Sequence, residues 1–181
     1  MSQNQDWPTN EQLPRAVRVR LDELKQRAGD PALREFAIWC ALQVAGGHWT
    51  VTKTVAAVRI AARDPSGEQL RQLQAETGGG ACAACVIGLK VNPAAASAHL
   101  AAFQCGRPDA YEAAVQTSWH VREHFAFTAL KEPHALSLTG KSALEATACA
   151  LGCQIDQLDR MIAACEPPQT RGDADTTKGG S

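Results

Sequence analysis

The sequence predicts an all-α fold, a compact bundle of about eight or nine short helices stacked as helical hairpins. Apolar residues recur every three or four positions along most of the chain, which is the period of an amphipathic helix. Alanine pairs such as Ala61-Ala62 and Ala101-Ala102 let neighbouring helices approach closely. Three dipeptides have the form of helix starts, because a capping side chain precedes a proline: Asp30-Pro31, Asp64-Pro65 and Asn92-Pro93.

Glycines and prolines divide the chain into its predicted helices. The segment that begins at Trp49 has a β-leaning start, but Val51, Val55 and Val58 keep the helical period. Gly152 is expected to form a turn between the last two helices, and the helix over 109–130 to be the longest. The predicted ranges are 11–28, 31–45, 49–62, 64–76, 81–91, 92–104, 109–130, 140–151 and 155–165.

The length of 181 residues predicts a single domain, which we place at 11–166. Residues 1–10 and 167–181 are polar and carry almost no apolar side chains, so both ends are expected to be disordered. A core of alanine, leucine, valine and isoleucine follows from an apolar fraction of 45% with only 5% aromatic residues.

Composition also argues against several classes of function. A net charge of −1 gives no general attraction to nucleic acid, and no apolar run reaches the roughly 18 residues of a membrane span. The first residues lack the basic and apolar regions of a signal peptide. Seven cysteines without regular spacing indicate reduced thiols. We therefore expect a cytoplasmic protein that binds neither membrane nor nucleic acid.

The pair Cys82 and Cys85 follows three glycines and is the one candidate for thiol chemistry. A Cys-x-x-Cys pair at a helix start resembles the small all-helical peroxidase-partner family related to carboxymuconolactone decarboxylase. That resemblance implies a thiol–disulfide oxidoreductase with a preceding glutamate and a following histidine. Here Leu89 stands where the histidine is expected, and the nearest preceding acid is Glu76. The alternative is two buried cysteines among alanines.

A metal site is a further minority interpretation. His120 and His124 lie four residues apart and share one helix face, and with Cys82 and Cys85 they make a set of zinc-type ligands. The alternative is a solvated polar face, which the neighbouring charged residues favour. We expect no metal and no cofactor.

A helix-turn-helix near the C-terminus is the weakest functional hypothesis. Ala148, Gly152 and Leu158 have the spacing of such a motif, and it would make the chain a transcriptional regulator. The reading helix would carry two acids and one arginine, which is a poor surface for phosphate contacts.

Three segments carry a resemblance to a family of bacterial proteins. The Trp-Cys-Ala helix in 36–41, the Asp-Pro-Ser segment in 61–70 and the alanine-rich run over 94–102 resemble the alanine-rich helical immunity proteins of bacterial toxin and secretion systems. They are also similar to an uncharacterised bacterial helical family. The first resemblance implies a small cytoplasmic protein that blocks a toxin by covering it, without catalysis. It transfers no site residues.

We therefore predict a non-enzymatic module that binds another protein, such as a toxin or secreted effector, or that acts as an adaptor or chaperone. The long helix over 109–130 is the expected contact face. Tyr111, Val115, Trp119 and Arg122 lie on successive turns of one face, and Phe125 continues the stripe approximately. Self-association through the same face is a further expectation.

Overall fold

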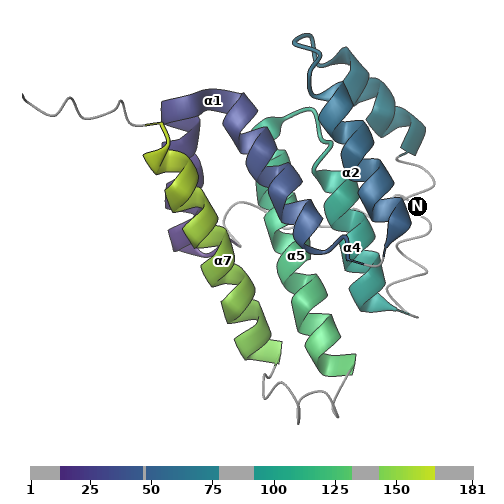
Figure 1. The fold of residues 1–181 in the computed structure, drawn as a ribbon, viewed down its shortest axis with the longest axis vertical. Helices are drawn as coiled ribbons and strands as arrows, with labels where there is room; N and C mark the ends of the chain where they lie inside the picture. Colours follow the sequence, from purple (N-terminus) through teal and green to yellow (C-terminus); the bar gives the residue numbers. More distant parts are fainter. Residues whose placement is uncertain (1–12, 47, 78–91, 132–142, 166–181) are drawn as a thin grey trace, which may run out of the picture.

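A computed structural model describes residues 13–46, 48–77, 92–131 and 143–165, and this part of the chain is all-helical (Figure 1). Six helices and no strand occur in it, which confirms the fold class. The helices are α1 (Arg15–Gln43), α2 (Trp49–Ala61), a helix at 68–77, α4 (Pro93–Gln104), α5 (Ala110–Lys131) and α7 (Ala143–Ala163). In these segments no helix combines the length and apolarity needed to cross a bilayer.

The predicted count of eight or nine helices is not supported. The two helices expected over 11–28 and 31–45 form one element, α1, which bends at Gly29. The φ and ψ angles of Gly29 are 71° and −165°, a conformation that favours glycine, and Pro31 follows inside the helix. α1 is therefore longer than α5. The helix predicted over 81–91 and the two expected disordered ends lie outside the described residues.

The expected turn at Gly152 is wrong, because α7 runs as one helix from Ala143 to Ala163. Gly152 has no positive φ angle, and a Cβ added to it would meet nothing within 4 Å. A glycine is compatible with either a turn or a helix interior, and its neighbours on both sides keep the helical period here. The helix-turn-helix hypothesis loses the turn on which it was based.

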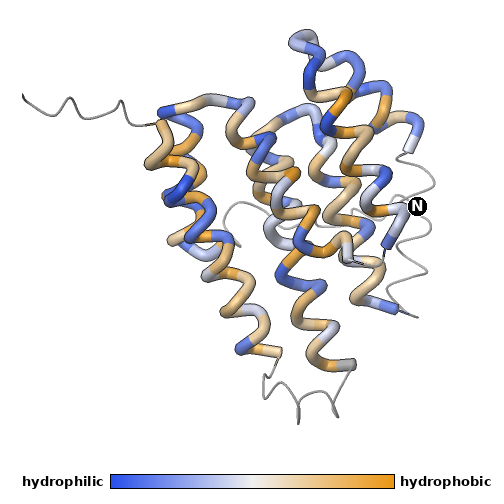
Figure 2. Tube along the Cα trace, in the orientation of Figure 1, coloured by the Kyte–Doolittle hydropathy of each residue, from blue (hydrophilic) through white to orange (hydrophobic). Residues whose placement is uncertain are grey.

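α5 lies at the centre of the bundle and packs against α4, α1 and α7, while α2 packs on α4 and α1 (Figure 1). The first limb of α1 runs beside α7, where Arg20 Nε donates to Asp159 at 2.6 Å. Apolar and polar residues are interspersed along the helices (Figure 2). At helical spacing this pattern gives a helix an apolar side, which faces the core. The core residues include Leu21, Leu24 and Leu158, all fully buried.

The small residues of α4 and α5 pack together as the sequence predicts. Ala98, Ala101, Ala113 and Ala114 are fully buried at the contact between these two helices. The start of α4 also follows the predicted form, since the side chain of Asn92 accepts a hydrogen bond from the Ala95 amide at 3.2 Å and Pro93 is the first helical residue.

The turn between α4 and α5 passes close to α2. A Cβ on Gly106 would lie 2.9 Å from Val58 Cγ2 and 3.4 Å from Gln74 Nε2. Asp109 Oδ1 accepts from the Glu112 amide at 2.7 Å and caps α5. The turn is thus fixed both by its own cap and by its fit against α2.

Two glycine substitutions test this account. We expect Gly106→Ala to lower the free energy of unfolding by about 1–3 kcal/mol, because the new methyl group overlaps Val58. Gly152→Ala should raise it by about 0.5–1 kcal/mol, because alanine favours a helix interior where it meets no neighbour. Urea denaturation measures both values. Destabilisation by Gly152→Ala would instead indicate the turn that we reject.

Candidate functional site

One hollow of the described chain is a cleft of about 500 Å³ with charged residues in its walls, which we call the charged cleft. It lies where the middle of α1, the end of α2, the turn over 62–67, the helix at 68–77 and the α4–α5 turn meet. Its walls combine charged side chains with apolar ones. Its charged lining residues are Asp30, Arg34, Glu35, Arg59, Arg63, Asp64 and Arg71.

Arg34 is the buried cation of the charged cleft. Only 6% of its surface is exposed, and its two terminal nitrogens donate to the carbonyl oxygens of Cys105 at 2.6 Å and Pro108 at 2.9 Å. Burial lowers the pKa of the Arg34 guanidinium, partly offset by the nearby Cys105 and Asp109, but an arginine stays charged in a protein. The fork of Arg34 thereby ties α1 to the α4–α5 turn.

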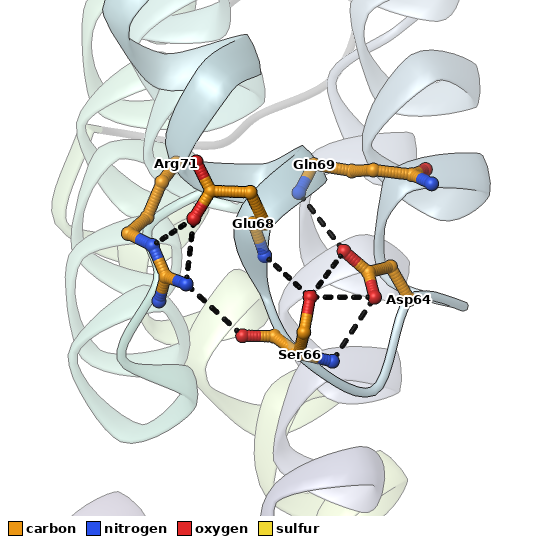
Figure 3. Close-up of polar contacts among 5 residues, drawn as sticks. All are labelled: Asp64, Ser66, Glu68, Gln69 and Arg71. Atoms are coloured by element: carbon orange, nitrogen blue, oxygen red, sulfur yellow. Dashed lines mark hydrogen bonds and ion pairs between the residues drawn. The ribbon is translucent and has the colours of Figure 1, made fainter.

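The turn that forms another wall is held by Asp64 (Figure 3). Its carboxylate accepts from the amides of Ser66 and Gln69, both at 3.0 Å, and from the Ser66 hydroxyl at 2.8 Å. These hydrogen bonds, led by that of Gln69, lower the pKa of Asp64. Arg71 closes the turn through Glu68 Oε2 at 2.8 Å and the Ser66 carbonyl at 3.2 Å.

This arrangement corrects the predicted start of the fourth helix. Asp64-Pro65 was expected to begin it, but the helix starts at residue 68. The Asp64 side chain caps amide groups of the turn from a position four residues earlier, and Gly67 supplies a φ angle of 69° just before the helix. The predicted capping role of Asp64 is confirmed, but the helix begins farther along the chain from Asp64 than predicted.

Four charged side chains of the charged cleft make no hydrogen bond or ion pair with the rest of the described chain. Arg59 lies near the end of α2 and Arg63 in the turn after it, and Asp30 and Glu35 lie on α1. The cleft therefore has two exposed cations on one stretch of chain and two exposed anions on another, and the Asp30 charge also acts on the guanidinium of Arg34. Charged side chains that line a shared hollow can form charge-assisted hydrogen bonds with a ligand that enters it.

The outward face of α2 carries two large apolar side chains that are exposed. Trp49 is 72% exposed and Ile60 is 63% exposed, and they are among the largest exposed apolar side chains described. The ammonium group of Lys53 lies 5.1 Å from the centre of the Trp49 ring, a cation–π distance. We call Trp49, Lys53 and Ile60 the α2 face.

The contact face that the sequence predicted on α5 is largely interior. Arg122 is only 7% exposed, its guanidinium lies 5.3 Å from the Trp119 ring, and burial lowers its pKa. Val115, on the same stripe, is 3% exposed. Trp119 is half-buried against this cation, so neither residue offers a free surface of the expected kind.

The other two predicted contact residues are also engaged within the bundle. Tyr111 donates its hydroxyl hydrogen to Asp22 at 2.7 Å, and Lys25 lies 5.3 Å from its ring. Phe125 lines a second, apolar groove of about 290 Å³ between α1, α5 and α7. α5 has three neighbouring helices, so large residues on several of its faces pack inside the fold, although Leu130 near its end is 64% exposed.

His120 and His124 contact different partners in the described chain, and the metal site predicted for them with Cys82 and Cys85 stays a prediction. His120 Nδ1 lies 2.8 Å from Glu123 Oε2, whereas His124 Nδ1 lies 2.8 Å from the Ala94 carbonyl oxygen, so the two rings serve different contacts. Across the described segments, no group of three or more histidine, cysteine, aspartate or glutamate residues is placed to hold a metal. Cys82 and Cys85 lie outside those segments, and their redox role stays a prediction.

Three histidines gather where α2 begins. The ring of His48 lies 5.9 Å from that of His99 and 6.5 Å from that of His124, measured between centres. Burial is the main cause that lowers the pKa of both His99 and His124, and the neighbouring His48 lowers it further. The cluster is not visible in the sequence, because its members come from α4, from α5 and from the residue that precedes α2.

The comparisons with known proteins leave the family open. No family model matches the sequence, and no significant match occurs among curated proteins or solved structures. The resemblance to helical immunity proteins therefore stays a prediction.

The histidine cluster predicts a loss of stability in mild acid. Because the folded pKa of His99 and His124 is lowered, the unfolded chain binds protons more readily, and stability falls as the pH drops below about 6.5. We expect a lower urea midpoint at about pH 5.5 than at about pH 7.5, and a smaller difference in His99→Gln. A midpoint that does not fall on acidification would contradict this.

Arg34 and Arg63 line the same cleft and predict opposite outcomes. Arg34→Lys should cost about 1–3 kcal/mol of unfolding free energy, because an ammonium cannot satisfy both carbonyls with the planar fork of arginine. Arg63→Gln should change it by less than about 0.5 kcal/mol, because Arg63 makes no such contact. Equal losses in urea denaturation would show that the two arginines do not differ in role.

Proposed function

We propose that the chain is a non-enzymatic protein that binds another protein through the α2 face. In this proposal it serves as an immunity protein, or as an adaptor or chaperone, of a bacterial toxin or secretion system. The observation that carries the proposal is the exposure of Trp49, at 72%, on an ordered helix. The choice between these roles comes from the sequence resemblance alone.

A large exposed tryptophan supports a contact role on energetic grounds. Trp49 and Ile60 leave apolar area in water that burial against a partner would remove, at about 25 cal/mol per Å². Tryptophan is also among the residues that contribute most to protein–protein binding. The half-buried Trp119 of the predicted α5 face, by contrast, already has part of its apolar area covered within the bundle.

The charge of α2 supports a partner of a particular kind. Lys53 and Arg59 are its cations, Arg63 follows just after its end, and no acidic residue occurs from 49 to 63. A partner surface that complements this helix is acidic and carries an apolar pocket for Trp49. The mechanism is steric: the helix covers the partner's surface, and no bond is made or broken.

The proposal is tested by co-purification from the native host, followed by reconstitution with the purified partner. We expect one stoichiometric partner to bind the wild-type protein, and Trp49→Ala with Ile60→Ala to weaken it by about 30-fold or more. Leu144→Ala is the matched control, because Leu144 is an 80% exposed apolar residue on α7 and should leave binding unchanged. Affinity should also fall as salt is raised.

Three outcomes would contradict the proposal. If the Leu144 variant lost as much partner affinity as the Trp49 and Ile60 variant, any exposed apolar side chain would matter equally and the α2 face would not be the specific contact. If the Trp49 and Ile60 variant kept its full affinity, the contact would lie elsewhere. Disulfide-trapped proteins captured through Cys82 or Cys85 would instead favour the oxidoreductase. Sedimentation of the purified chain separates binding of a second protein from self-association.

A further inference from the structure

The charged cleft keeps opposite charges apart that would ordinarily pair. Arg59 lies at the end of α2 and Arg63 in the turn that follows it, Asp30 and Glu35 lie on α1, and no ion pair within 4 Å joins these cations to these anions in the described chain. All four side chains are exposed, and the charge of Asp30 also acts on the buried guanidinium of Arg34. The four residues line a hollow of about 500 Å³, which is the size range of small-ligand sites.

Fixed contacts hold the walls of the cleft in this spacing. Arg34 secures the floor by its hydrogen bonds to the Cys105 and Pro108 carbonyls, which join α1 to the α4–α5 turn. On the opposite side, the Asp64 carboxylate is occupied by amides of its own turn, and Arg71 by Glu68 (Figure 3). These three charged groups thus build the cleft and leave the other four to receive a ligand.

We propose that the charged cleft binds a zwitterionic ligand, an amino acid or short peptide with a free ammonium and a free carboxylate group. Arg59, on the last turn of α2, and Arg63, in the turn that follows, receive the carboxylate through guanidinium N–H groups. Asp30 and Glu35 receive the ammonium group, which donates hydrogen bonds to their oxygens. No bond is made or broken in this binding.

A ligand with one sign of charge fits this cleft less well. An anion alone would pair with Arg59 and Arg63 but would leave Asp30 and Glu35 unpaired and close to it. A cation alone would do the reverse, beside the buried guanidinium of Arg34. Only a ligand with both signs neutralises both walls, which is why the arrangement of the four charges selects a zwitterion.

The inference goes beyond the proposed function but shares Arg59 and Arg63 with it, because these cations also belong to the surface that an acidic partner would meet. Asp30 and Glu35 of the cleft lie on α1 and take no part in the proposed partner contact, which is tested at Trp49 and Ile60, so variants of these two pairs tell the proposals apart. Loss of one activity with retention of the other therefore separates the two proposals.

The test is calorimetric titration of the full chain with L-alanine and with dialanine, two probes that differ in the spacing of their charges. We expect at least one to bind, and the better one to weaken by about tenfold or more when its amino group is acetylated or its carboxylate is amidated. Preference for alanine indicates a free amino acid, and preference for dialanine indicates a peptide.

Variants locate the binding. Arg59→Gln with Arg63→Gln should abolish the heat of binding, and Asp30→Asn with Glu35→Gln should do the same, while thermal unfolding remains cooperative. The matched control is Arg15→Gln with Arg18→Gln, which removes two α1 cations outside the cleft and should leave binding intact.

The proposal is overturned by any of three results. Neither probe binding at about 10 mM would remove the site. Capped probes binding as tightly as the free ones would show that the charges do not select the ligand. Sulfate binding as tightly as the better probe would reduce the cleft to a simple anion site.

Discussion

The fork of hydrogen bonds from Arg34 to the Cys105 and Pro108 carbonyls is the constraint on which the site depends. It joins the middle of α1 to the turn that ends α4 and starts α5. Because α5 packs against three other helices, the position of its first turn affects the whole bundle. The same fork forms the floor of the charged cleft, so stability and the shape of the site have a common cause.

Residue size explains why α4 and α5 pack closely together while one side of α2 stays exposed. Alanines such as Ala101 and Ala113 bring α4 and α5 together and leave little room between their backbones. α2 packs on α4 and α1 with Val51, Val55 and Val58, and its other side remains in water. The α2 face and the charged cleft are what this one-sided packing leaves uncovered.

Local features of the fold could be predicted from the sequence because they depend on neighbouring residues. The cap at Asn92 and the alanine contacts follow from side-chain size and hydrogen bonding within one turn. Gly152 could not be assigned, because a glycine suits a turn and a helix alike until the packing of α7 is known. Asp64 is a similar case, because its capping role could be predicted from the sequence but the length of the turn between it and the helix could not.

The candidate site was harder to predict than the fold, because it is made of residues far apart in the chain. Asp30, Arg34 and Arg63 carry no shared motif, and only the bundle brings them to one cleft. The burial of Arg122 and Val115 on the predicted α5 contact face could not be foreseen for a related reason. An amphipathic pattern shows that a helix has an apolar and a polar face, but it does not show how many neighbouring helices cover each face. Arg122, a charged residue in a large-residue stripe, is covered by the bundle at 7% exposure.

Native-state hydrogen exchange of Arg34→Lys beside the wild type tests the central claim most directly. If Arg34 ties α1 to the α4–α5 turn, the amides of 105–113 should lose protection first, and those of 143–163 in α7 should keep theirs. A uniform loss over the whole chain, or no loss in 105–113, would contradict the view that this single side chain holds the cleft together.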